Sequence, residues 1–178
     1  LAGLPAYPAF LWRETGPIEW YVLRGYAYVL ADARGTGASD EGIWEYFGPE
    51  EQTDLYDAIE WIACQEWCTG KVGMIGQSYF GMAQWSAAIQ APPSLACIAP
   101  YDAKIDHYRD GQFHGGIPAF GLPIIWSFGV RYNHLNGPPG PESAERVKTD
   151  LVQGMLAHPP DDEFWRSRSP YWQLASST

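Results

Sequence analysis

Apolar runs of strand length alternate with segments of helical periodicity in the first part of the chain. The runs cover residues 26–31, 71–75 and 95–100. Apolar positions recur at helical spacing over residues 55–62, and an alanine-rich segment over residues 79–90 follows the second run. This order of strand, helix, strand, helix and strand predicts a parallel sheet with right-handed crossovers. The near-continuous first run predicts a central strand that is covered on both faces.

The pattern changes in the second half of the chain. Residues 102–121 mix charges, histidines and glycines, and an apolar stretch lies over residues 116–130. Residues 142–157 predict an amphipathic helix, and Asp161 and Asp162 are typical caps of a further helix. This half therefore predicts a helical, loop-rich insertion over the sheet.

Composition narrows the class of protein. The chain has 178 residues, 46% of them hydrophobic, with nine tryptophans and eleven tyrosines. This is enough apolar surface for one folded domain or a large part of one. The net charge is −10 and no cluster of Lys and Arg is present, so we expect no nucleic-acid partner. The apolar stretch over residues 116–130 contains two prolines and is too short to span a bilayer, so we expect no membrane partner.

The number and spacing of the cysteines indicate whether the protein belongs in a reducing or an oxidising compartment. The chain has three, at Cys64, Cys68 and Cys97. An odd number does not build a disulfide framework, and no nearby Cys or His completes a zinc site around the first two. We therefore predict buried free thiols, no metal and no other cofactor. Free thiols favour a reducing, cytoplasmic location, whereas the absence of a starting Met leaves a secreted protein open.

A Gly-x-Ser turn at residues 76–78 lies between the second predicted strand and the helix after it. This layout is typical of a nucleophile elbow, in which a tight turn presents the oxygen of Ser78 to a pocket. The amide of Tyr79 would then lie at a helix N-terminus and stabilise a developing oxyanion. Phe80 stands where the G-x-S-x-G pattern has its second glycine, and Gly81 follows one place later. An ordinary serine in a strand-to-helix turn is the alternative interpretation.

Charged residues follow the first predicted strand. Asp32 and Arg34 stand in a glycine-containing loop at the expected rim of the active site, and we predict that they form a structural ion pair. Asp54 and Asp57 lie one helical turn apart. We interpret them as solvated or capping acids, with a paired acid–base role as the alternative.

Together these residues resemble the cocaine-esterase and Xaa-Pro dipeptidyl-peptidase family of serine hydrolases, which also includes α-amino-acid ester hydrolases. The elbow of that family reads G-x-S-Y-x-G, which accounts for Phe80 and Gly81, and the likeness covers most of residues 20–170. The segments that carry it are residues 25–29, 32–39, 54–61, 70–74, 76–85, 113–116 and 161–170.

The resemblance implies an α/β-hydrolase core, a partial parallel sheet flanked by helices, with a helical cap inserted into it. We expect the N-terminal part of the core at residues 1–104, the cap at residues 105–168 and the return towards the core at residues 169–178. Ser78 would be the nucleophile and the backbone amide of Tyr79 one oxyanion donor. In this family the triad acid and base follow the cap and the second oxyanion donor comes from upstream, so none of them is expected within this chain.

The resemblance also implies a pocket that the cap shapes. Trp126 and Phe128 are its candidate lining residues. Amino-ester hydrolases of the family bind the α-amino group of the substrate with a carboxylate, and the resemblance places Asp110 near the sequence position of that carboxylate. The expected partner is a small-molecule ester or a short peptide. We interpret the four histidines as cap or surface residues, although one of them could serve Ser78 as base: His107, His114, His134 and His158.

Two hypotheses on function remain. The first is a serine hydrolase that cleaves an ester or amide bond through an acyl-enzyme on Ser78, with an acyl esterase favoured over a Xaa-Pro dipeptidyl-peptidase. The second is a catalytically incomplete α/β fragment or a binding module, because a serine without its base loses several orders of magnitude in rate. Residues 1–178 alone are expected to be inactive.

Overall fold

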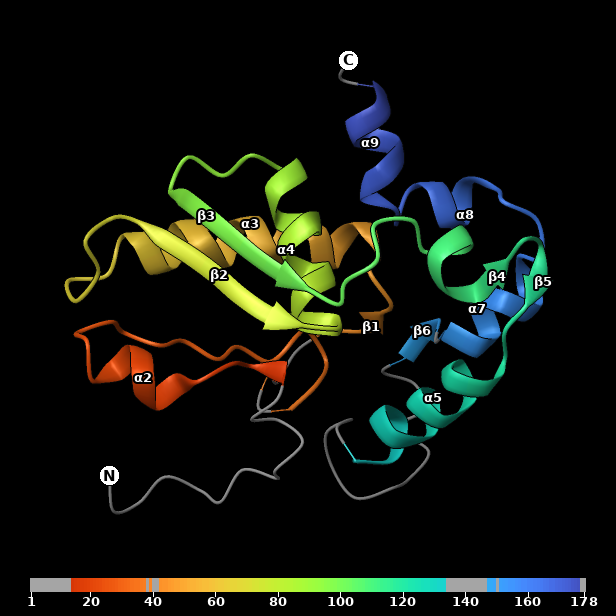
Figure 1. Ribbon diagram of the computed structural model, residues 1–178, viewed down its shortest axis with the longest axis horizontal. Helices are drawn as coiled ribbons and strands as arrows, with labels where there is room; N and C mark the ends of the chain where they lie inside the picture. The colour runs from red at the N-terminus through yellow and green to blue at the C-terminus, as the bar shows by residue number, and fades with distance from the viewer. Residues whose placement is uncertain (1–13, 38, 40–41, 134–146, 150, 177–178) are drawn as a thin grey trace. The chain divides into compact units, whose positions relative to one another are not determined.

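The structure of the protein is a computed structural model, which describes residues 14–37, 39, 42–133, 147–149 and 151–176 (Figure 1). The chain divides into two compact units. The sheet unit consists of residues 1–30 and 56–104, and the aromatic unit of residues 31–55 and 105–178. Helix α3 (Pro49–Ala63) begins in the aromatic unit and ends in the sheet unit.

The sheet unit is built on two parallel strands, β2 (Val72–Gln77) and β3 (Leu95–Tyr101). Their register pairs Gln77 with Tyr101 at the carboxyl ends. Helix α4 (Tyr79–Ile89) connects the strands and packs against both of them (Figure 1). The strand–helix–strand order and the parallel pairing are those predicted from the apolar pattern.

Small side chains allow α4 to lie close to the sheet. The helix carries no charged residue, and Met82, Ala83 and Ala87 are buried against the strands. The entry to β3 is fixed from α3, where the carboxylate of Glu60 accepts hydrogen bonds from the amide and hydroxyl of Ser94 at 2.9 and 3.0 Å. The sheet unit is therefore held together by apolar packing and by side-chain hydrogen bonds such as this one.

The strand predicted at residues 26–31 is wrong. Residues 26–33 have no regular secondary structure, and the side chains of Tyr26, Val29 and Leu30 are exposed. They follow the short helix α2 (Ile18–Val22). A central strand needs apolar side chains that are covered on both faces, and this run lacks that cover.

The aromatic unit contains short strands and helices. Strand β1 (Trp44–Glu45) pairs in parallel with β6 (Val147–Thr149), and β4 (Phe113–His114) pairs antiparallel with β5 (Ile117–Pro118). Its helical elements are the π-helix η1 (Tyr108–Gln112), α5 (Gly121–Asn133), α7 (Leu151–Ala157), α8 (Glu163–Arg166) and α9 (Pro170–Ser176).

The helices predicted in this half are partly correct. The amphipathic helix expected over residues 142–157 is confirmed only for α7, because residues 147–149 form β6 and residues 142–146 lie outside the described residues. Asp162 caps α8, since its side chain accepts a hydrogen bond from the amide of Phe164. In the described part of the chain, no helix has both the length and the apolar character to cross a membrane.

Aromatic side chains form the core of this unit. Trp44, Tyr46, Phe47 and His107 are all buried, with ring centroids 4.9–6.3 Å apart where they touch. The hydroxyl of Tyr46 hydrogen-bonds Nδ1 of His107 at 3.1 Å, and burial raises the pKa of that phenol. The cluster therefore includes polar groups that pair inside it.

The loop that carries Tyr46 and Phe47 is held by side chains from distant positions. Phe47 has a φ of 46° and is fully buried, and its amide donates to the carboxylate of Glu51 at 2.9 Å. The buried guanidinium of Arg168 donates to the carbonyl of Tyr46 at 3.2 Å, to that of Phe164 at 2.9 Å, and to the carboxylate of Glu45. Burial lowers the pKa of this guanidinium from its ordinary value.

Candidate active site

Ser78 forms the turn between β2 and α4, at the carboxyl end of the parallel strands. Its φ of 56° and ψ of −120° lie in a region that costs a residue with a side chain about 1–3 kcal/mol. The Ser78 amide donates to Tyr101 O at 3.3 Å, and the Ser78 carbonyl accepts from the Met82 amide at 2.8 Å. Strand pairing and helix thus both fix the turn, which has the strained geometry expected of an elbow.

Two glycines make this turn sterically possible. A Cβ on Gly76, where φ is +152°, would lie 2.4 Å from the Cβ of Phe80 and 3.0 Å from the carbonyl oxygen of Glu14. A Cβ on Gly81 would lie 2.7 Å from the Cβ of Ala103. These distances are too short for real side chains, so α4 reaches the sheet only with glycine at both positions. Gly76 thus leaves room for the Cβ of Phe80, and Gly81 leaves room for Ala103 and for the carbonyl oxygens of Gly76 and Tyr101.

Tyr79 is the first residue of α4. The first amides of a helix have no acceptor within the helix, and the helix dipole gives this end a partial positive charge. Because Tyr79 directly follows Ser78, the amide end of the helix meets the serine at the same turn. An oxyanion that forms at Ser78 would be stabilised from this end.

Gln84 is a residue whose role the sequence reasoning missed. The side chain is fully buried, and its Nε2 donates to Phe80 O at 2.9 Å and to Gly76 O at 3.3 Å. Its Oε1 accepts from the amide of Ala99 at 2.8 Å. One amide side chain thereby ties α4 to both strands beside the turn. A glutamine on an otherwise apolar helix face was the available signal.

Two acidic groups lie near the turn. Asp102 follows β3, has a φ of 51°, and accepts a hydrogen bond from Gln77 Nε2 at 2.9 Å. Glu14 belongs to the segment that passes over Gly76, and burial raises the pKa of its carboxyl above the usual value. The sequence pattern gave no reason to connect either carboxyl with Ser78.

The predicted ion pair between Asp32 and Arg34 is wrong. Arg34 instead binds Asp54, with Nε 2.8 Å and Nη2 2.5 Å from the two carboxylate oxygens. This bidentate geometry suits a planar guanidinium, and it raises the pKa of Arg34 further. Asp54 therefore has a structural partner on α3, while Asp57 is exposed.

The predicted substrate-binding residues all belong to the aromatic unit, whereas Ser78 and Tyr79 belong to the sheet unit. Trp126 packs its ring against Trp44 and Tyr46, at centroid distances of 5.8 and 5.6 Å. Phe128 is 60% exposed on α5. Asp110 accepts hydrogen bonds from the amides of residues 105 and 106 at 3.4 and 3.0 Å. Their roles in substrate binding stay predictions.

The histidines differ in their surroundings. His107 is buried in the aromatic cluster, and its amide donates to the hydroxyl of Ser169 at 2.9 Å. His158 pairs with Asp162 through Nδ1 at 2.8 Å and stacks on Phe164 at 4.1 Å. His114 is exposed, and His134 lies outside the described residues.

The thiols are free, as predicted, but they are not buried. Cys64 and Cys97 are exposed, and Cys68 is half-buried. Cys97 on β3 pairs in register with Gly73 on β2, where an added Cβ would lie 3.1 Å from the sulfur of Cys97. Among the described residues, no group of three or more His, Cys, Asp or Glu side chains could hold a metal ion.

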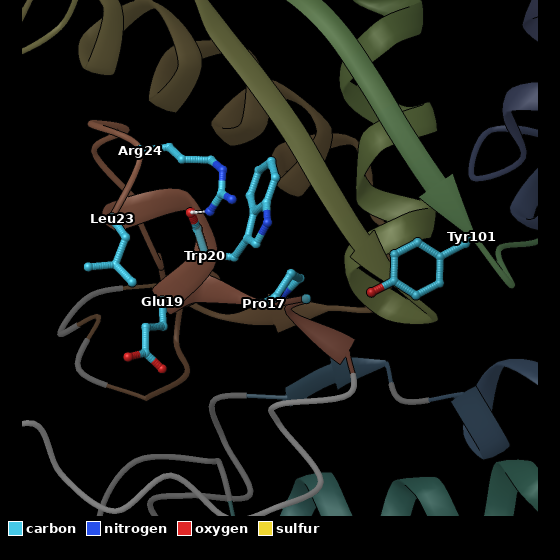
Figure 2. Close-up of a pocket in the computed structure, with 7 residues that line it drawn as sticks. Pro17, Glu19, Trp20, Leu23, Arg24 and Tyr101 are labelled. Carbon is cyan, nitrogen blue, oxygen red and sulfur yellow. Dashed lines mark hydrogen bonds between the residues drawn. The ribbon is translucent and has the colours of Figure 1, made fainter.

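A shallow pocket of about 610 Å³ lies between α2 and the end of β3. Figure 2 shows Arg24 and Trp20 on one side of it and Tyr101 on the other. The guanidinium of Arg24 lies 3.8 Å above the Trp20 ring and donates to the Trp20 carbonyl at 3.1 Å. Ser78 is not among the lining residues, so the pocket is separate from the elbow.

Comparison with solved structures identifies the fold. A CocE/NonD family hydrolase of Staphylococcus aureus superposes with a TM-score of 0.67 and 34% sequence identity, over 77% of this chain and 23% of that one. The parallel strands flanked by helices therefore form part of an α/β-hydrolase fold.

Sequence comparison gives the relatives. The cocaine esterase of Rhodococcus sp. (strain MB1 Bresler) is 39% identical over 201 residues, which is 94% of this chain and 34% of that protein. The Xaa-Pro dipeptidyl-peptidase of Lactobacillus helveticus is 30% identical over 60% of this chain and 16% of its own length. The chain thus spans about a third or less of the relatives it matches. The family profile described as X-Pro dipeptidyl-peptidase (S15 family) matches residues 6–178, and the chain therefore belongs to this family of hydrolases.

Proposed function

We propose that this chain supplies the nucleophile of a serine hydrolase that cleaves an ester or amide through an acyl-enzyme. The oxygen of Ser78 attacks the substrate carbonyl carbon while its proton passes to a histidine base. The oxyanion that forms is stabilised by the amide of Tyr79. The leaving group departs with the proton from the histidine, and water then releases the acyl group by the same steps.

One observation carries this proposal: Ser78 is the strained residue between β2 and α4. A positive φ on a residue with a side chain persists only where the surroundings enforce it, and here Gly76 and Gly81 are required for the turn. An ordinary serine in a strand-to-helix turn needs no such geometry. The same geometry brings the first amide of α4 to the serine, which the proposed chemistry requires.

The triad base and acid are proposed to lie outside residues 1–178. The order Ser, then acid, then His is general in α/β-hydrolases. Within this chain, His107 is buried in the aromatic cluster and His158 is engaged with Asp162. We accordingly interpret residues 105–168 as the cap, with Asp110, Trp126 and Phe128 as its candidate substrate contacts.

Ester hydrolysis is the favoured activity. Supporting it, the cocaine esterase is more similar to this chain, and over a greater part of it, than the Xaa-Pro dipeptidyl-peptidase. Both activities use the same acyl-enzyme chemistry, so the elbow does not separate them. Parallel assays with a p-nitrophenyl ester and a Xaa-Pro anilide would do so, and faster turnover of the anilide would contradict the preference.

The test of the nucleophile is covalent labelling of the complete gene product with a fluorophosphonate. We expect one label per protein, on Ser78, and complete loss of labelling and of ester hydrolysis in Ser78→Ala. Ser86→Ala is the matched control, since Ser86 is a buried serine on the same helix, α4. If Ser78→Ala is labelled like the wild type, another residue is the nucleophile and the proposal fails. If the folded wild type is not labelled, the proposal also fails and the non-catalytic alternative stands.

A further inference from the structure

Asp102 is the charged residue beside the elbow that the proposed mechanism leaves unused. It follows β3 as Ser78 follows β2, and the two strands pair in parallel up to Gln77 and Tyr101. Ser78 and Asp102 therefore stand side by side at the carboxyl edge of the sheet, on strands about 4.8 Å apart.

Two features fix Asp102 in this place. Its φ of 51° resembles the 56° of Ser78, and Asp is one of the few residues besides Gly that tolerate this region. Its carboxylate accepts a hydrogen bond from Gln77 Nε2 at 2.9 Å. Within the described part of the chain, this is the one hydrogen bond to that carboxylate, and no Lys or Arg there pairs with it.

We propose that Asp102 is a positioning residue whose negative charge stabilises the protonated form of the general base that serves Ser78. This inference rests on the proposed function. A base within hydrogen-bond reach of Ser78 lies within roughly 10 Å of the Asp102 carboxylate. When the base takes the proton of Ser78 it becomes a cation, and a fixed negative charge at this distance favours that state.

Few other charges face Asp102. The helix α4 and the strands β2 and β3 carry none. Glu14 lies on the segment that passes over Gly76, and Lys104 follows Asp102 by two positions. Glu19 and Arg24 border the pocket beside Tyr101. Glu14 is the competing acid, because it is the other carboxyl near the turn and burial raises its pKa above the usual value.

The test is the pH dependence of kcat/KM for a p-nitrophenyl ester, measured on the complete gene product. Asp102→Asn removes the charge but keeps an oxygen that can accept from Gln77, and Asn tolerates the same φ. We expect the acidic limb to move to lower pH by about half a unit, because the protonated base loses a favourable charge. The shift should shrink in 1 M salt, where the screening length falls to about 3 Å.

Two matched variants separate charge from structure. Gln77→Leu removes the hydrogen bond and keeps the charge, so its acidic limb should move less than that of Asp102→Asn. Glu14→Gln removes the competing acid and should leave the limb near its wild-type position.

An unmoved limb in folded Asp102→Asn overturns the inference, as does an equal shift in Gln77→Leu or a larger one in Glu14→Gln. Fluorophosphonate labelling of the wild type is measured in parallel. Loss of labelling would signal failure of the proposed function, whereas labelling with an unmoved limb would signal failure of this inference alone.

Discussion

The turn at Ser78 and the loop at Phe47 both have a strained backbone, but different interactions stabilise the two conformations. Their φ values are 56° and 46°. The Ser78 turn forms only because Gly76 and Gly81 have no side chains, since a Cβ at either position would clash. Around Phe47 the conformation depends on side chains that are present, and one of them, Arg168, lies far along the chain. A local motif can specify the first arrangement, whereas only the folded unit specifies the second.

The largest effect is expected at Gly76. Gly76→Ala adds a Cβ only 2.4 Å from that of Phe80 at a φ of +152°, so we expect a loss of about 4 kcal/mol in the free energy of unfolding. Gly70→Ala is the control, because Gly70 has a φ of +81° with nothing within 4 Å of an added Cβ. It should cost only about 1 kcal/mol. Urea denaturation of the complete protein measures both, and equal losses would show that steric contact does not hold the elbow.

The second prediction concerns Arg168. Arg168→Met removes the guanidinium that binds the carboxylate of Glu45 and donates to the carbonyls of Tyr46 and Phe164, so we expect a loss of about 3 kcal/mol. Arg166→Met is the matched control, because Arg166 is 47% exposed and lies 3.4 Å from Asp161. Its removal should cost less than about 1 kcal/mol. Denaturant titrations measure both losses. Similar losses for the two variants would show that the buried contacts of Arg168 do not stabilise the Phe47 loop.

The third prediction concerns Gln84, whose buried side chain joins α4 to β2 and β3 by hydrogen bonds. Gln84→Leu fills a similar volume but leaves the amide of Ala99 and the carbonyl of Gly76 without this partner. We expect a loss of about 2 kcal/mol, measured as a lower urea midpoint with an unchanged slope. A neutral result would mean that packing alone joins α4 to the strands.

The smallest effect is expected at Glu14. Its folded-state pKa is raised by burial, so the folded protein binds this proton more tightly than the unfolded chain does. Stability from this group is present below the unfolded pKa and is lost as the pH rises through the folded pKa. Glu14→Gln should therefore raise the melting temperature slightly at pH 7 and have no effect below about pH 4. A lower melting temperature at pH 7 would contradict this sign.

The sequence predicted those features that depend on local patterns. The strand–turn–helix order around Ser78 and the cap of α8 by Asp162 follow from neighbouring residues. The prediction of a strand at residues 26–31 was wrong, because apolar composition does not reveal whether other elements of the fold cover these side chains. Proximity in the sequence favours Asp32 as the partner of Arg34, whereas helix α3 brings Asp54 within hydrogen-bond distance.

The remaining supports could not be predicted, because they join residues that are distant in sequence. Arg168 reaches Glu45 and Tyr46 across more than a hundred positions. The link between Gln77 and Asp102 depends on strand register, which the apolar pattern alone leaves undefined. The sequence identified the nucleophile candidate, and the fold was needed to find the groups around it.

The pairing of Gly73 with Cys97 leaves an exposed thiol on the surface of the two-stranded sheet, and the reactivity of this thiol can be measured. Gly73 has no side chain to shield the exposed sulfur of Cys97. The rate at which a maleimide alkylates this thiol therefore depends on whatever else lies over the face. With Cys64 and Cys68 replaced by serine, a fast reaction would indicate that Cys97 is open to solvent, and a slow one that another part of the complete protein packs over it.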